Sequence, residues 1–223
     1  MSSLILFEDD HLLVVHKPSG INTHKPDRHA PDGLHEWLTR HGRALSIHQR
    51  LDKQTSGVIV FGKSPRANQS LSRQFESHRV RKEYLLLAER RPRRSKFCAD
   101  AFKAVTEFEY LQEHCGAHLV AARPITGKTH QIRRHAADNG FPILGDTEYG
   151  GAPAPRLMLH AHRLTLDEGV FEASVPESFD DRDPVTVARE ARQLMFDEDT
   201  SAYRLLSNRD VVVDWFDGHA LVQ

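Results

Sequence analysis

Short apolar runs separated by polar turns recur along most of the chain, and they predict β-strands. Residues 4–7 and 12–16 flank the polar turn at 8–10. Residues 57–62 form a continuous apolar run of the kind found in buried strands. Similar runs predict further strands at positions 83–88, 106–111, 118–122, 157–166 and 170–175.

Apolar residues spaced four positions apart predict a helix after the third of these strands. The pair Ser64-Pro65 supplies a capping hydroxyl and a proline suited to the first helical turn. Ala67, Leu71 and Phe75 then form one apolar stripe, which we expect to pack against the strands.

Three further segments have helical patterns. Asp32 can cap a short helix, and residues 130–139 form a longer one that Gly140 ends, because glycine accepts the left-handed conformation found after many helices. Asp183-Pro184 starts a final amphipathic helix with Val187, Ala191, Leu194 and Met195 on its inner face. Strands and helices alternate without a steady βαβ repeat, which favours an α+β fold.

The composition is that of an ordinary folded protein. Of 223 residues, 39% are hydrophobic and 27% charged, which is enough for a core without stabilising crosslinks. No apolar run approaches the roughly 18 residues of a membrane span, and the first residues lack the basic start and cleavage site of a signal peptide. We therefore expect a cytoplasmic protein, with no membrane partner, in which Cys98 and Cys115 are ordinary, partly buried thiols.

A net charge of −1 conceals an uneven distribution. Residues 1–134 contain 23 Lys and Arg against 14 Asp and Glu, whereas residues 135–223 contain 7 against 17. Five cations fall within residues 90–96, RRPRRSK, which predicts an exposed loop. A basic half favours a polyanionic partner such as RNA, although a solvated charged surface has the same composition.

The segment HQRLDKQTSG, at positions 48–57, places an acid between two cations just before an apolar strand. Loops supported by rigid strands frequently carry catalytic groups. Positive charge from Arg50 and Lys53 favours the ionised form of Asp52, which a nucleophile or base requires. A surface aspartate in a polar turn looks the same in sequence, because structural ion pairs imitate active sites.

A second polar cluster, TGKTHQIRRH, joins a glycine turn to a helix start at positions 126–135. Exposed amides together with Lys128, Arg133 and Arg134 could bind a phosphate or a carboxylate, although a helix with a basic face is equally compatible. Tyr84 follows basic residues in the segment KEY, and taken alone it is typical of a strand residue that packs on a core.

The 15 histidines raise the question of a metal site. His160 and His162 are separated by one residue, and His130 and His135 lie five positions apart, but neither spacing matches the regular pairs of zinc sites. The sequence lacks HExxH, GxSxG and GxxxxGK[ST], which argues against a zinc protease, an acyl-transfer elbow and a P-loop. We expect no metal, and a hydrolase that uses these histidines is the least favoured reading.

Several segments occur together and in order: VVHKPSGINTH, HQRLDKQTSGVIVFGKS, KEYLLLAE, RPITGKTHQIRRHAADNGFPILGDTEYGG and LMLHAHRL. In this combination residues 4–180 strongly resemble the RluA-type pseudouridine synthases. The resemblance implies an α+β fold with a mixed, mainly antiparallel sheet and flanking helices around a central catalytic cleft. It also implies isomerisation of uridine in RNA, without a cofactor, because the reaction needs no redox change and no group donor.

The resemblance assigns roles to individual residues. Asp52 aligns with the family's catalytic aspartate, and Tyr84 with the tyrosine that contacts the target base. Arg133 aligns with the arginine that pairs with the catalytic carboxylate, and Leu51 and Leu159 are expected to line the pocket. Asp52 could act as a nucleophile on the ribose or base, or remove a sugar proton to give a glycal, and both routes stay open.

Cations near these motifs are expected to contact the RNA backbone and to offset the cost of flipping the target nucleotide out of its stack. They are Arg50, Lys53, Arg79, Lys82, Arg90, Arg91, Lys128, His130 and Arg134. Two positions depart from the commonest pattern of the family: Lys128 stands where arginine is usual, and Gln49 precedes Arg50.

The resemblance ends near residue 180 and divides the chain into a catalytic domain, 1–180, and an acidic extension, 181–223. The N-terminal S4 domain that many family members carry is expected to be absent. The extension is similar to the entry region of some ribosomal-RNA methyltransferases, which suggests the start of a fused region or a relic of one. The alternative is a terminal helix and strand that pack on the catalytic domain.

The sequence leaves the target open, since ribosomal and transfer RNA, and one uridine or several, all fit the motifs. We expect a monomer. The main alternative to an enzyme is a catalytically inactive RNA-binding protein of the same fold. Intact Asp52, Tyr84 and Arg133 argue against that alternative, because binding alone would not need the three together.

Overall fold

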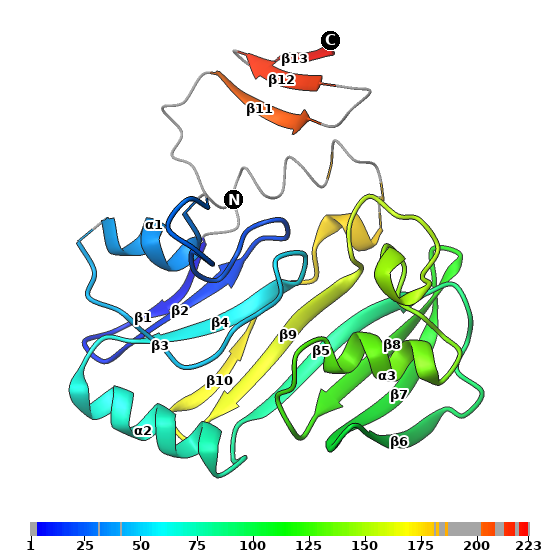
Figure 1. The fold of residues 1–223 in the computed structure, drawn as a ribbon, viewed down its shortest axis with the longest axis horizontal. Helices are drawn as coiled ribbons and strands as arrows, with labels where there is room; N and C mark the ends of the chain where they lie inside the picture. Colours follow the sequence, from blue (N-terminus) through cyan, green and yellow to red (C-terminus); the bar gives the residue numbers. More distant parts are fainter. Residues whose placement is uncertain are drawn as a thin grey trace.

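A computed structural model describes residues 4–30, 32–40, 42–180, 182 and 186, and the backbone of residues 202–207, 212–216 and 219–222. A ten-stranded sheet dominates the described chain (Figure 1). Its strands are β1 (Ile5–Glu8), β2 (Leu12–Lys17), β3 (Ser46–Ile47), β4 (Ser56–Gly62), β5 (Arg81–Ala88), β6 (Lys96–Ala101), β7 (Ala104–His114), β8 (Ala117–Pro124), β9 (Leu159–Leu166) and β10 (Gly169–Glu172). The helices are α1 (Leu34–Arg40), α2 (Pro65–Glu76) and α3 (Gln131–Asp138), with short 3-10 turns η1 (Thr147–Tyr149) and η2 (Glu177–Phe179).

The sheet is mixed but mainly antiparallel. Its strands follow the order β1-β2-β4-β9-β5-β8-β7-β6, with β10 beside β9 and β3 beside β4. The pair β4–β9 is parallel, and there Ser56 lies beside His160 and Gly57 beside Ala161. Gly57 has a φ of +124°, and a Cβ at this position would collide with the backbone of Ala161. The α+β fold with a mixed sheet and flanking helices is therefore confirmed.

Local signals placed two helices correctly. The Ser64 hydroxyl accepts a hydrogen bond from the backbone N–H of Ala67 at 3.2 Å, and α2 follows directly. After α3, Gly140 has a φ of +82°, as predicted for the residue that ends this helix.

Strand β6 was not predicted, because its pattern is weak. Its six residues include one buried side chain, Ala99, and the strand lies at the edge of the sheet. The basic loop predicted at 90–96 therefore runs directly into a strand at Lys96. A half-exposed edge strand lacks the continuous apolar run that identified β4. The expectation that Cys98, in this strand, and Cys115 are partly buried is wrong, because both are exposed.

The terminal segment contains a separate three-stranded antiparallel sheet. Its strands are β11 (Ala202–Ser207), β12 (Val212–Phe216) and β13 (His219–Val222). A helix and a strand were predicted here, and the helix that starts at residues 183–184 lies outside the described residues. The assignment of 181–223 as an extension stays a prediction.

Two hydrophobic clusters form the core, and both contact the same tyrosine. One cluster contains Leu13, Val60 and Leu71 from β2, β4 and α2. The other contains Leu86 from β5 and further side chains from β7, β8, α3 and the segment before β9. Tyr84 packs against both clusters, so its ring lies where the two halves of the molecule meet.

Two buried histidines lie on β2 and β9, the strands on either side of β4. The rings of His16 and His160 are 5.4 Å apart, and His160 also pairs with the Ser56 hydroxyl at 2.9 Å. Burial lowers the pKa of His16 to about 4, and it lowers the pKa of His160 well below the usual value. Both side chains are therefore neutral in the folded protein near pH 7.

We predict that the free energy of unfolding falls as the pH decreases from about 6.5 towards 4. The unfolded histidines take up protons near pH 6.5, whereas folded His16 does so only near pH 4, so the unfolded state binds more protons in this window. Each such histidine contributes up to about 1.4 kcal/mol per pH unit. Urea denaturation at pH 7 and pH 5 measures the effect. His16→Leu should show a flatter pH dependence, and a slope equal to that of the wild type would contradict the assignment.

Candidate active site

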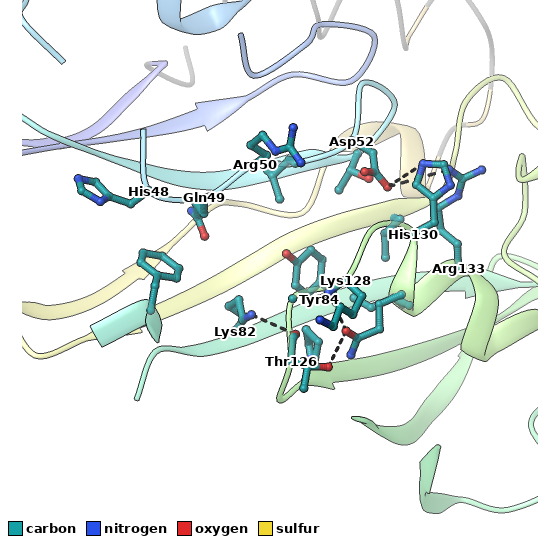
Figure 2. A pocket seen from close by; sticks show the side chains of 18 of the residues that line it. His48, Gln49, Arg50, Asp52, Lys82, Tyr84, Thr126, Lys128, His130 and Arg133 are labelled. Atoms are coloured by element: carbon teal, nitrogen blue, oxygen red, sulfur yellow. Dashed lines mark hydrogen bonds and ion pairs between the residues drawn. The ribbon is translucent and has the colours of Figure 1, made fainter. Parts of the chain in front are cut away.

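A cavity of about 440 Å³ opens between the loop before β4, the strands β5 and β9, and the start of α3 (Figure 2). Nine residues predicted for the site line it: Arg50, Leu51, Asp52, Lys82, Tyr84, Lys128, His130, Arg133 and Leu159. The other lining residues were not predicted: Ile47, His48, Gln49, Thr55, Phe75, Pro124, Thr126, Gly127, Gln131 and Ile132. Segments far apart in the sequence therefore meet in one pocket.

The remaining predicted cations lie outside this pocket. Arg79 forms an exposed ion pair with Asp167 at 3.0 Å. The Arg91 and Arg134 guanidinium groups lie over the rings of Tyr110 and Phe102, at 4.4 and 3.8 Å. The assignment of these arginines, and of Lys53 and Arg90, to RNA contacts stays a prediction.

A buried lysine holds the loop that carries Asp52. The Lys17 side chain is fully buried, and its Nζ donates hydrogen bonds to the carbonyls of Pro18, Ile21 and Lys53 at 2.9, 2.7 and 3.2 Å. Burial lowers the pKa of Lys17 to about 7, and the charge of Asp52 opposes that shift. Three acceptors match the three N–H groups of an ammonium.

Threonine and glycine complete this attachment. The Thr23 hydroxyl donates to the Leu51 carbonyl and accepts from the Leu51 N–H, both at 3.0 Å. The Gly20 N–H donates to the Lys53 carbonyl at 2.8 Å. Lys17 and Thr23 lie in the segment VVHKPSGINTH, but no role was predicted for either, because their partners on the Asp52 loop are 36 and 28 positions away.

The cations nearest the Asp52 carboxylate come from the region of α3. Its Oδ2 lies 4.0 Å from Nη1 of Arg133 and 3.9 Å from Nε2 of His130. The predicted neighbours Arg50 and Lys53 form no ion pair with it within the described residues. The pairing of Asp52 with Arg133 is thus a long ion pair rather than a hydrogen-bonded one.

Arg133 binds Asp146 more closely than it binds Asp52. Its Nε and Nη2 donate to the two carboxylate oxygens of Asp146 at 2.7 and 2.6 Å, and Nη2 also donates to Glu148 at 2.8 Å. Burial opposes the charge on Arg133, but the hydrogen bonds and negative charges of Asp146 and Glu148 together outweigh it and raise the pKa of the guanidinium. Sequence analysis missed Asp146, although it lies in the recognised segment GDTEYGG.

Burial shifts the pKa values of Tyr84 and Lys82, two side chains on the wall opposite Asp52. Burial raises the pKa of the Tyr84 phenol well above its usual value, and the Asp52 charge adds to the shift. Burial also lowers the pKa of Lys82, whose Nζ donates to the Thr126 carbonyl at 3.3 Å. Tyr84 therefore keeps its proton and presents a neutral aromatic face to the pocket.

The histidine pairs considered from the sequence have structural partners. His160 and His162 both bond to the Ala173 carbonyl, at 3.2 and 3.0 Å, and His135 bonds to the Thr106 hydroxyl at 3.0 Å. One group among the described residues could hold a metal ion, and it does not line the pocket: His114, Cys115 and Asp180.

Comparison with known proteins identifies this arrangement. A family model described as RNA pseudouridylate synthase matches residues 11–138, which include Asp52, Tyr84 and Arg133. The chain belongs to this family. Its members are isomerases.

Two relatives of the family show how much of the chain is shared. The dual-specificity RNA pseudouridine synthase RluA of Escherichia coli strain K12 is 33% identical over 198 residues, which cover 77% of this chain and 90% of that protein. The ribosomal large subunit pseudouridine synthase D of Borreliella burgdorferi is 32% identical over 199 residues, which cover 74% of this chain and 61% of that protein.

A solved structure supports the same fold. Human RNA pseudouridylate synthase domain containing 4 superposes with a TM-score of 0.68 at 22% identity, covering 84% of this chain and 92% of that one. At this identity the likeness speaks for the architecture alone. The pseudouridine synthase fold inferred from the motifs is therefore confirmed.

We predict that Arg133→Ala lowers both stability and activity. The variant leaves the fully buried Asp146 carboxylate without its partner, which typically costs about 3–5 kcal/mol. Thermal denaturation and a turnover assay measure the two effects. Glu148→Gln is the matched control, because Glu148 is 57% exposed and its loss should leave the melting temperature close to that of the wild type. Equal melting temperatures for Arg133→Ala and the control would refute the dependence of Asp146 on Arg133.

Proposed function

We propose that Asp52 is the catalytic carboxylate of an RNA pseudouridine synthase that acts on specific uridines in folded ribosomal or transfer RNA. The observation that supports it best is one pocket lined by Asp52, Tyr84 and Arg133 together. The name of one relative gives the large ribosomal subunit, and the name of another gives dual specificity towards RNA, which is compatible with a target in either class.

The reaction breaks the bond between N1 of uracil and C1′ of ribose, turns the base and joins C5 to C1′. A proton leaves C5 and a proton is added to N1, so the atoms balance within one nucleotide. No oxidant and no group donor take part, and we propose that the enzyme needs no cofactor. The protein must instead supply a positioned carboxylate and a place to hold the detached base.

Asp52 acts either as a nucleophile towards the ribose or base, or as the base that removes a sugar proton to give a glycal. Arg133, at 4.0 Å, places positive charge beside the carboxylate, and Nε2 of His130 lies 3.9 Å from it. Tyr84 offers a flat face on which the base can stack and a hydroxyl that keeps its proton.

The target nucleotide must leave its stack to reach the pocket, which costs a few kcal/mol. Lys82, Lys128 and Arg50 line the pocket and can repay part of this cost through phosphate contacts. We propose that the cations outside the pocket, including Arg90 and Arg91, extend this contact along the RNA. The enzyme would act as a monomer in the cytoplasm.

We predict that Asp52→Asn abolishes pseudouridine formation while RNA affinity stays within a few-fold of the wild type. The amide keeps the size of the side chain but removes the charge and the nucleophilic oxygen. Site-resolved pseudouridine mapping of RNA from a gene deletion, complemented with each variant, tests it and also identifies the target. Asp10→Asn, an exposed acid outside the pocket, is the matched control and should restore the modification.

Full modification by Asp52→Asn would remove Asp52 from the mechanism. A wild-type protein that binds RNA but forms no pseudouridine, and no adduct with fluorouridine-substituted RNA, would instead identify a binding protein of the same fold.

A further inference from the structure

One side chain in the pocket has a buried hydroxyl that the protein does not satisfy. Thr55 is 2% exposed and lines the same cavity as Asp52. Its Oγ1 is buried, and no donor or acceptor within the described chain lies at hydrogen-bonding distance. Buried hydroxyl groups normally have a partner, so this one requires an explanation.

Other buried threonines show what a structural role looks like in this protein. Thr23 is 3% exposed, and its hydroxyl makes two hydrogen bonds to the backbone of Leu51. Thr106 is fully buried, and its hydroxyl pairs with Gln131 and His135 at 2.9 and 3.0 Å. Thr55 has equal burial without such partners, so its hydroxyl does not hold the fold together.

The backbone of Thr55 has a fixed position relative to that of Asp52. The backbone N–H of Thr55 donates to the Asp52 carbonyl at 3.0 Å, which closes a four-residue turn from the one to the other. Ser56, the next residue, begins β4 and pairs with His160 on β9. The backbone on both sides is therefore ordered before a ligand binds, and rotation about the Cα–Cβ bond is enough to turn the hydroxyl towards the cavity.

A second pocket residue has an unsatisfied amide. The Nε2 of Gln49 is buried, lines the cavity through its side chain, and has no hydrogen-bond partner among the described residues. Unsatisfied polar groups therefore occur on the same loop before and after Asp52. A base that enters the pocket carries carbonyl oxygens and an N–H. These can form hydrogen bonds with the unsatisfied hydroxyl and amide groups.

We propose that Thr55 is a substrate-contacting residue whose hydroxyl donates a hydrogen bond to a carbonyl oxygen of the target uracil. This inference rests on the proposed function. When the bond between C1′ and N1 breaks, its electron pair remains on uracil, and the negative charge is shared by N1 and the two carbonyl oxygens. A donor fixed in a pocket away from water stabilises that charge, and the contact strengthens as the charge develops.

The variants Thr55→Val and Thr55→Ser separate this role from a structural one. Valine has the shape of threonine but no hydroxyl, and since the hydroxyl has no protein partner, the melting temperature should stay equal to that of the wild type or rise. Turnover by Thr55→Val should fall roughly tenfold, mainly in kcat, because the contact strengthens in the transition state. Thr55→Ser keeps a hydroxyl and should retain most of the activity. Thr106→Val is the structural control and should lower the melting temperature.

RNA with a modified target nucleotide identifies the acceptor. Sulfur accepts hydrogen bonds poorly, so 2-thiouridine or 4-thiouridine at the target should slow the wild type, and one of them should slow Thr55→Val much less. A 2′-deoxy target tests the ribose hydroxyl as the alternative acceptor, and there both proteins should be slowed equally.

Each outcome bears on a different statement. Thr55→Val with wild-type kcat, measured beside an active wild type and an inactive Asp52→Asn, would overturn the Thr55 proposal and leave the role of Asp52 intact. The proposal would also be overturned if the 2′-deoxy target slowed the wild type but not Thr55→Val. It would likewise be overturned if each thio substitution slowed Thr55→Val as much as it slowed the wild type. An active Asp52→Asn would instead overturn the proposed function.

Discussion

The attachment of the loop at 51–55 to the turn at 17–23 determines whether this molecule has an active site. A carboxylate on a loop has many orientations, and catalysis needs a single one. The buried Lys17 ammonium and the Thr23 hydroxyl bind the loop backbone on either side of Asp52. The cost of burying the lysine is offset by three carbonyl acceptors and by the nearby negative charge. The loop thus acquires the rigidity of the strands β2 and β4 that flank it.

The second support comes from the other half of the sheet. Arg133 reaches Asp52 only at 4.0 Å, because Asp146 and Glu148 already occupy its other donors. This arrangement leaves the carboxylate close to a fixed positive charge but without a hydrogen bond from that side. An aspartate that must react is better placed in this way than one committed to a bidentate pair. Tyr84, packed against both cores, sets the distance between the two halves.

Patterns in the sequence predicted the parts of the fold that depend on neighbouring residues. The strand β4 and the start of α2 follow from an apolar run and a Ser-Pro cap, which act within a few positions. The edge strand β6 pairs with the adjacent β7, but its half-exposed residues give no clear apolar pattern. The roles of Lys17, Thr23 and Asp146 depend on partners 36, 28 and 13 positions away, and no local pattern encodes them. The motifs located Asp52, Tyr84 and Arg133 through the family resemblance, and their meeting in one pocket agrees with it. The unsatisfied hydroxyl of Thr55 could be recognised only from the packing around it.

The parallel contact between β4 and β9 has a consequence for synthesis of the chain. Ser56 and His160, which pair there, are 104 positions apart. Contacts of such separation form late, after the intervening chain has been made. A nascent chain that has just left the ribosome up to residue 150 already carries Asp52, Tyr84 and Arg133, but it lacks β9 and the Leu159 side chain that lines their pocket. Translation therefore completes this active site only shortly before it completes the catalytic domain.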